Sequence, residues 1–197
     1  MKDCVSLENC ECIRISECSR SLLDGFYIDN NKDAKSLEYY LKFPDGAMLE
    51  ELNNTARTYV VIDKTLNCIV GYFTLKAGQC NIKRGWLFRR KTFIIPGIEL
   101  AMFAVNDRYR KLYAGPHFSF GEWIFYTYVS EKAIEASEII GVKILYIFAL
   151  PEKPKLISFY NKIGFVNPLY VSGKKKKVRT VIPTFDQGCI FMFQTIK

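Results

Sequence analysis

The stretch that decides the fold spans residues 98–165 and contains four segments in a defined order. The apolar run "IELAMFAV" at 98–105 is followed by the basic, turn-rich stretch "NDRYRKLYAGPHFSFG" at 106–121. An amphipathic helical pattern, the apolar run "VKILYIFAL" at 142–150 and the segment "FYNKIGF" at 159–165 come next. This order predicts a strand, an anion-accepting loop, a helix, a buried strand and a short helix that carries a tyrosine. Because a helix N-terminus attracts negative charge, the junction of loop and helix is expected to receive an anionic group such as a pyrophosphate.

The rest of the chain predicts a mixed α/β protein without internal repeats. Alternating residues predict a strand in "CECIRIS" at 10–16, and β-rich runs at 57–63 and 68–76 predict a hairpin. A helical pattern at 31–54 is interrupted near Pro44 and Gly46, which predicts two short helices. The segment 77–97 is expected to be an irregular basic connection, and two strands are expected in the tail around a lysine-rich turn.

The helix after Gly121 is expected to pack one face on a sheet. Gly141 is placed to end this helix in a left-handed conformation, as Gly164 is for the helix that Pro154 begins. The apolar stripe of the first helix recurs every three or four residues and consists of Phe125, Val129, Ala133, Ala136 and Ile140.

Composition limits the classes of protein and partner. The 197 residues, 49% of them hydrophobic, fit a single domain over 1–197. The 28 Lys and Arg against 20 Asp and Glu give a net charge of +8, which favours nucleic acid, a membrane surface or a phosphorylated cofactor as partner. A basic protein without such a partner is the alternative. No apolar run approaches the ~18–20 residues of a membrane span, and "MKDCVSLENCE" does not resemble a leader, so a cytoplasmic protein that does not enter a membrane is expected.

The seven cysteines predict free thiols and no metal site. Cys10 and Cys12, the close pair, would point to opposite sides of a strand, whereas zinc sites use a tight pair on a turn. The odd total argues against a complete disulfide framework.

Six segments together resemble the GNAT superfamily of N-acetyltransferases, and within it the branch of toxins that acetylate aminoacyl-tRNA. They are "ARTYVVID", "CIVGYFTLKAG", "PGIELAMFAVNDRYR", "IIGVKILYIFAL", "FYNKIGF" and "DQGCIFMFQ", and the resemblance extends from about Phe26 onward. It implies an α/β fold of layered α+β type, with a mixed, mostly antiparallel central sheet, a splayed strand pair and flanking helices. It also implies acetyl-CoA as co-substrate, an acyl-CoA-binding core at about 98–165, a homodimer and an antitoxin partner.

The pyrophosphate loop departs from the superfamily pattern Arg/Gln-x-x-Gly-x-Gly/Ala. The corresponding window is "PHFSFG" at 116–121, with Pro116 in place of the Arg or Gln and Ser119 in place of the first glycine. A serine can cap the helix and allow phosphate to approach, although it does not adopt positive φ as freely as glycine. The residues expected to bind the cofactor are Phe103, Ala104, Val105, His117, Phe118, Ser119, Phe120, Gly121, Glu122 and Phe159.

Acyl transfer to an amine requires an oriented thioester, a neutral amine and a proton for the departing thiolate. A splayed strand exposes backbone groups that can pair with the amides of pantetheine, and residues 103–105 are placed for this. Tyr160 is the expected catalytic residue, because a phenol with a pKa near ~10 is protonated at neutral pH; a packing role is the alternative. Glu99 resembles a position that holds a water-activating carboxylate in some members, and an exposed glutamate at a strand end is the alternative.

Three basic clusters, at 83–91, 108–111 and 174–179, favour a polyanionic acceptor over a small cationic one. No acidic cluster is evident near the expected active-site segments, as a polyamine or aminoglycoside would require. The residues expected to bind tRNA are Arg89, Arg90, Lys174, Lys175, Lys176 and Lys177. An acetyltransferase for a small amine or a protein amine, and a non-catalytic relative with a degenerate CoA loop, are the alternatives.

Overall fold

The chain forms a mixed α/β structure in which β4 and β5 are the parallel pair. The computed structural model describes residues 7–29, 32–84, 91–113, 118–167, 180–181 and 188–197. The strand order is β1-β2-β3-β4-β5-β7, with β6 beside β3. The pairs β1–β2, β2–β3, β3–β6 and β5–β7 are antiparallel. The fold class expected from the sequence, a mostly antiparallel sheet with flanking helices, is confirmed.

Backbone contacts divide the chain into two compact units, Met1–Lys76 with Ala101–Val129 and Ala77–Leu100 with Ser130–Lys197. The strands β3 (Cys68–Arg84) and β4 (Lys91–Val105) contribute to both units. The other elements of the first unit are η1 (Leu7–Asn9), β1 (Cys10–Arg14), η2 (Ile15–Glu17), α1 (Arg20–Asp24), α2 (Lys32–Lys42), η3 (Pro44–Met48), α3 (Leu49–Leu52), β2 (Arg57–Asp63), α4 (Asp107–Tyr113), α5 (Phe120–Ile124) and η4 (Phe125–Val129). The expected extent of one domain over 1–197 stays a prediction.

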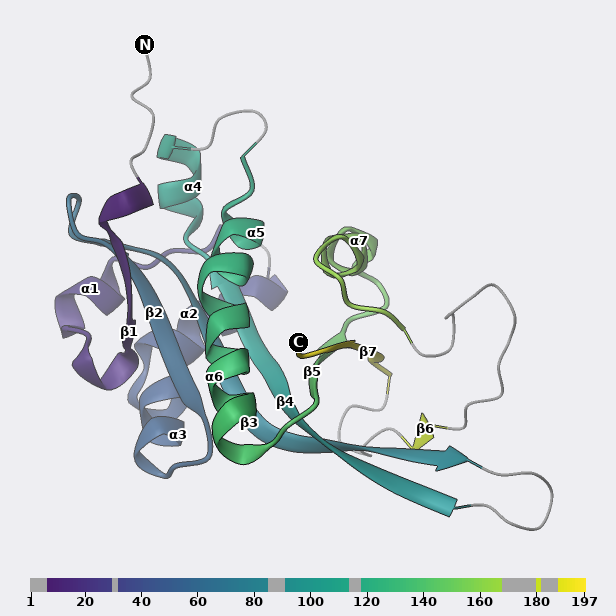
Figure 1. Ribbon diagram of the computed structural model, residues 1–197. Helices are drawn as coiled ribbons and strands as arrows, with labels where there is room; N and C mark the ends of the chain where they lie inside the picture. Colours follow the sequence, from purple (N-terminus) through teal and green to yellow (C-terminus); the bar gives the residue numbers. More distant parts are fainter. Residues whose placement is uncertain (1–6, 30–31, 85–90, 114–117, 168–179, 182–187) are drawn as a thin grey trace. The chain divides into compact units, whose positions relative to one another are not determined.

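Helices cover both faces of the strands in the first unit (Figure 1). On one face Val60, Ile62 and Tyr72 form a buried core with residues of α1 and α2, and the Tyr72 hydroxyl donates to the Leu37 carbonyl at 2.7 Å. On the other face a Cβ at Gly71 would lie 2.6 Å from a side-chain carbon of Ile124 and 2.7 Å from the carbonyl oxygen of Ala104. A glycine is therefore needed where α5 crosses β3 beside the end of β4.

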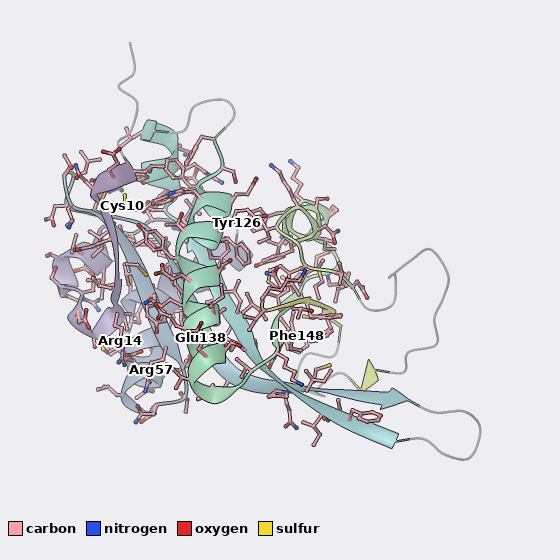
Figure 2. The ribbon with its side chains drawn as sticks, viewed as in Figure 1. Cys10, Arg14, Arg57, Tyr126, Glu138 and Phe148 are labelled. Atoms are coloured by element: carbon pink, nitrogen blue, oxygen red, sulfur yellow. The ribbon has the colours of Figure 1, made fainter. Side chains whose placement is uncertain are left out.

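An ion pair between a partly exposed arginine and a buried glutamate ties β1 to α3. Glu51 is 5% exposed and accepts hydrogen bonds from the Arg14 guanidinium and, at 3.3 Å, from the Thr58 backbone N–H. Arg57 donates to the Glu51 carbonyl at 3.4 Å (Figure 2). Because the carboxylate is fully partnered, its burial is tolerated, and removal of the Arg14 guanidinium would leave a buried carboxylate without its cationic partner.

Asn106 fixes the end of β4. Where the register of β2 and β3 shifts, Ile69 and Val70 offer carbonyl groups that β2 does not use in a regular ladder. The Asn106 backbone N–H donates to the Val70 carbonyl at 2.8 Å, and its side-chain amide donates to the Ile69 carbonyl at 2.8 Å. Its side-chain oxygen accepts from the Arg108 N–H at 3.1 Å and so caps α4.

The sequence predicted a turn-rich loop at 106–121, and this prediction is wrong over Asp107–Tyr113, which form helix α4. The sequence suggested turns because Asn, Asp and Gly gather there, yet Asn106 and Asp107 serve as cap and first-turn residues of a helix. Capping by Asn106 therefore converts the first half of the expected loop into helix.

The second unit adds α6 (Ser130–Ile140), β5 (Ile144–Ala149), α7 (Pro154–Lys162), β6 (Thr180–Val181) and β7 (Ile190–Thr195). Its strands β3 and β4 run side by side as a long hairpin (Figure 1). The expectation of an irregular connection at 77–97 is therefore wrong over the paired residues. Each strand supplies hydrogen-bond partners to the other, which offsets the weak strand propensity of its glycines and lysines.

Aromatic side chains form the core of the second unit. Tyr146 and Phe148 of β5 contact Phe191 of β7 with ring centroids 5.5 and 5.7 Å apart (Figure 2). A Cβ at Gly78 would lie 1.9 Å from the Tyr146 hydroxyl, so a glycine in β3 makes room for this ring.

The expected helix ends are confirmed, and the apolar stripe is correct in part. Gly141 has φ +70° and Gly164 φ +97°, and Pro154 occupies the first turn of α7. Phe125, Val129 and Ala133 are buried, but Ile140 is 61% exposed. The helix has π-helical geometry through η4. The residues after η4 therefore lie on other faces of the helix than a regular repeat of 3.6 residues per turn predicts.

We predict that Asn106→Ala lowers the free energy of unfolding by about 1–3 kcal/mol, because the buried Ile69 carbonyl loses its donor. Urea unfolding measures the change. Asn53→Ala, at an exposed position just after α3, is the matched control and should change stability by no more than ~0.5 kcal/mol. Equal stability of the two variants would contradict the role given to Asn106.

Candidate functional site

The pairing of β4 with β5 is short. It covers Gly97, Ile98 and Glu99 opposite Ile144, Leu145 and Tyr146. Both strands continue, β4 to Val105 and β5 to Ala149, without a further described pair between them. The splayed strand pair expected from the sequence is therefore confirmed, and the β4 backbone beyond Glu99 is not used in a ladder with β5.

A cavity of about 640 Å³ opens at the end of β4 in the first unit. This volume lies in the range of small-molecule sites, ~300–1,000 Å³. The cavity is formed by the end of β4, the segment before α2, α2 itself and the start of α4. Its lining residues are Ile28, Asp29, Ala34, Leu37, Phe103, Ala104, Val105, Asp107 and Arg110. Three of the residues expected to bind the cofactor, those at 103–105, thus line one cavity.

Two ion pairs form the polar side of this cavity. Asp107 accepts from the Asp29 backbone N–H at 2.7 Å and pairs with Arg110, while the Asp29 carboxylate pairs with Lys111. The hydrogen bond from Lys111 lowers the pKa of Asp29, so this carboxylate is ionised at neutral pH. Two aspartates therefore lie at the cavity, each with a cationic partner, and the expectation that no acidic cluster accompanies the active-site segments stays a prediction.

Glu38 of α2 holds the segment that forms the cavity wall. Its carboxylate accepts from the Ile28 backbone N–H at 3.0 Å and from Lys35 and Lys42, each at 2.9 Å. Desolvation by burial acts to raise the pKa of Glu38, but these hydrogen bonds together lower it to about 2. The ionised carboxylate therefore fixes Ile28 against α2.

Ser119 caps the helix that follows the loop, as expected. Its hydroxyl accepts from the Glu122 N–H at 3.3 Å. Among the described residues, the backbone N–H groups of Phe120 and Gly121 have no acceptor, so these two amides are available to an anion. The Glu122 amide was also expected to bind phosphate, but it is already used in the cap.

The start of α5 rests on a hydrogen-bonded tyrosine that the sequence analysis missed. Phe120 is buried and packs edge-on against Tyr109, with ring centroids 5.3 Å apart. The Tyr109 hydroxyl donates to the Asp63 carboxylate at 2.8 Å, and burial and this hydrogen bond raise the pKa of Tyr109. Asp63 also accepts from two backbone N–H groups of the β2–β3 turn. An aspartate at a predicted hairpin turn was the available signal.

Tyr160 lies on α7 in the second unit and is 8% exposed. Its ring contacts Phe159 and Phe165 edge-on, at 5.3 and 5.6 Å between centroids. Burial raises the pKa of Tyr160, so the phenol is protonated at neutral pH. Its hydroxyl has no hydrogen-bond partner among the residues that the structure describes, which leaves the proton available.

Glu99 is partly buried and accepts from the Tyr146 hydroxyl at 3.4 Å. This pair occupies the last described rung between β4 and β5. The alternative of an exposed glutamate at a strand end is therefore wrong.

Several expected site residues lie outside the described part of the chain: His117, Arg89, Arg90, Lys174, Lys175, Lys176 and Lys177. Over the described residues, no group of three or more His, Cys, Asp or Glu side chains is arranged to hold a metal ion. Among the described cysteines, Cys10, Cys18, Cys68 and Cys80 are free thiols. In the part of the chain that the structure covers, no helix combines the length and apolar character needed to cross a membrane.

Comparison with solved structures identifies the fold as that of bacterial toxins. No family model and no curated protein matches the chain. A tyrosine-to-phenylalanine mutant of the toxin AtaT has a TM-score of 0.65 at 17% identity, covering 96% of this chain and 91% of the other. A structure described as a bacterial toxin has a TM-score of 0.63 at 16% identity, covering 95% and 90%. AtaT complexed with acetyl-methionyl-tRNAfMet has a TM-score of 0.63 at 18% identity, covering 94% of each chain.

We predict that Glu38 makes stability depend on acid pH. Its pKa is 4.5 when unfolded and about 2 when folded, so its contribution is present above pH 4.5 and is lost as the pH falls toward 2. Glu38→Gln should therefore flatten the decline of the unfolding free energy between these pH values, measured by urea unfolding. Ser36→Ala, an exposed change on the same helix, should keep the wild-type decline. An unchanged slope in Glu38→Gln would contradict the assignment.

Proposed function

We propose that the chain is an acetyl-CoA-dependent N-acetyltransferase whose acceptor is the α-amine of an aminoacyl-tRNA. The observation that carries the proposal is the β4 backbone at 103–105, which leaves its ladder with β5 and lines a cavity of about 640 Å³. The fold supports the reaction class, because similar toxins have been solved with acetyl-CoA and with acetyl-methionyl-tRNAfMet.

The residues present fit acetyl-CoA. The β4 backbone at 103–105, which lines the cavity, carries donors and acceptors of the kind that the pantetheine amides need. The free amides of Phe120 and Gly121, at the positive end of a helix, suit the pyrophosphate, and Gly121 lets it approach closely. Acetyl-CoA supplies an activated acetyl group as a thioester.

Tyr160 would deliver the proton that the thiolate needs. The amine nitrogen forms the new bond to the acetyl carbon, and the carbon–sulfur bond breaks. The nitrogen loses one proton and the sulfur gains one, so a phenol that gives its proton to sulfur must recover one from the amine side. Burial holds Tyr160 protonated, which fits a donor and excludes it as the initial base.

Aminoacyl-tRNA fits the basic composition of the chain. A net charge of +8 favours a polyanionic acceptor. The α-amine of an aminoacyl ester is less basic than an ordinary alkyl amine, so its acetylation needs no strong dedicated base. Because similar structures include AtaT bound to the C-terminus of the antitoxin AtaR, we also propose an antitoxin partner for this chain. The homodimer implied by the family resemblance stays a prediction.

A second candidate acceptor is a small cationic amine. Asp29 and Asp107 line the cavity, and carboxylates at a rim attract a cationic substrate. Their pairing with Lys111 and Arg110 reduces this attraction, which is why the aminoacyl-tRNA is preferred.

We predict that the purified chain transfers labelled acetyl from acetyl-CoA to a mixed aminoacyl-tRNA pool, and that deacylated tRNA remains unlabelled. The readout is label in precipitated RNA, lost on mild alkaline hydrolysis of the ester. Label in spermidine or a protein lysine instead of aminoacyl-tRNA would replace the proposed acceptor by the second candidate.

We predict that Tyr160→Phe lowers kcat by about 10²–10⁴-fold, the usual contribution of general acid catalysis. The phenyl ring keeps the contacts with Phe159 and Phe165, so acetyl-CoA affinity by calorimetry and thermal stability should be retained. Tyr126→Phe, at a 58% exposed position on η4 (Figure 2), is the matched control and should retain full activity. Full activity of Tyr160→Phe would leave Tyr160 a packing residue.

A further inference from the structure

Arg108 differs from its neighbours on α4 in the partner it uses. Arg110 pairs with Asp107 and Lys111 pairs with Asp29. The guanidinium of Arg108 instead lies over the ring of Tyr27, 5.3 Å from the ring centroid. Arg108 is exposed and makes no ion pair within the described ranges, so its N–H groups are available to an external anion.

Two helices contact Tyr27. Its backbone carbonyl accepts from the Asp107 N–H at 2.9 Å, which joins it to the start of α4. From α2, the Lys35 ammonium lies 4.4 Å from the ring centroid. A guanidinium that already lies over an aromatic ring loses less conformational freedom when it binds an anion.

The Arg108–Tyr27 pair borders the 640 Å³ cavity. Ile28 and Asp29, which follow Tyr27 along the chain, line the cavity, as do Asp107 and Arg110 on either side of Arg108. The wall formed by Ile28, Leu37 and Phe103 is apolar, while the two carboxylates supply hydrogen-bond acceptors. The site thus combines a guanidinium that can bind an anion, an aromatic ring, an apolar wall and carboxylates that can accept hydrogen bonds from an amine.

We propose that Arg108, which lies over the Tyr27 ring, holds a backbone phosphate at the 3′ end of an aminoacyl-tRNA. The part of the adjoining cavity formed by Ile28 and Leu37 takes the esterified amino acid, while the β4 backbone at 103–105 is left to acetyl-CoA. This inference rests on the proposed acetylation of aminoacyl-tRNA. A phosphate close to an ester-linked amino acid matches an arginine beside a cavity, because arginine binds phosphate through two parallel hydrogen bonds. The apolar wall selects amino acids with apolar side chains, since a charged side chain would lose its hydration there.

Arg108→Ala tests the phosphate contact in the full-length chain. Steady-state acetylation of an aminoacyl-tRNA pool is measured over a series of NaCl concentrations, and acetyl-CoA affinity is measured by calorimetry. We expect KM for aminoacyl-tRNA to rise about tenfold, kcat and acetyl-CoA affinity to stay unchanged, and the log–log salt slope to flatten by ~0.7, as for one phosphate contact with a single strand. The wild-type chain should acetylate tRNA pools charged with apolar amino acids at a higher rate than pools charged with acidic or basic ones.

Two further variants, one control and one test of the ring, complete the experiment. Arg20→Ala removes an exposed arginine at the start of α1, which contacts the carbonyl of Lys42 at the C-terminal end of α2. This control should leave KM and the salt slope at wild-type values. Tyr27→Leu removes the aromatic ring beneath the Arg108 guanidinium and should raise KM for aminoacyl-tRNA while acetyl-CoA affinity stays unchanged.

The outcomes separate this inference from the proposed function. If wild type acetylates aminoacyl-tRNA and Arg108→Ala has an unchanged KM, the inference alone is overturned. If Arg108→Ala instead weakens acetyl-CoA binding, the arginine binds a phosphate of the cofactor and the inference is also overturned. If wild type acetylates only a small amine, the proposed acceptor and this inference fail together.

Discussion

The hydrogen bonds of Asn106 are the constraint on which the candidate site depends. Its backbone and side-chain N–H groups donate to consecutive carbonyl groups of β3, and its side-chain oxygen caps the N-terminus of α4. This fixes three things: where β4 ends, where the cavity residues of β4 lie relative to β3, and the direction in which Arg108 and Arg110 leave the sheet. If this segment were an exposed loop, the buried carbonyl groups of β3 would lack the donor that they require, and none of these three features would be fixed.

The cavity is held by polar contacts rather than by apolar packing alone. The Asp29 N–H reaches Asp107 across 78 residues of sequence, and the Ile28 N–H reaches Glu38. Ionised carboxylates are strong acceptors of backbone N–H groups, so the segment before α2 is fixed without filling the cavity with side chains. The site therefore retains both its shape and its empty volume.

The sequence predicts the regular elements well because their patterns are local. The strand at 57–63 and the helix ends at Gly141 and Gly164 lie where alternation and glycine chemistry place them. Two features could not be predicted in this way. Helix α4 depends on a cap that also bonds to β3, and the long β3–β4 hairpin depends on mutual pairing of two weak strands. The cavity unites residues near 30 with residues near 105, and no local pattern joins these segments.

The same distinction applies to charge. A net charge of +8 indicates a polyanionic partner but cannot locate it, because most cations in a folded chain have partners of their own. Of the three cations on α4, two are neutralised by aspartates at the cavity, and their pairing keeps the helix and the preceding segment together. The guanidinium of Arg108 is stacked instead of paired. A stacked cation keeps its hydrogen-bond donors for an incoming anion, so the pattern of pairing, more than the number of basic residues, determines where a phosphate can bind.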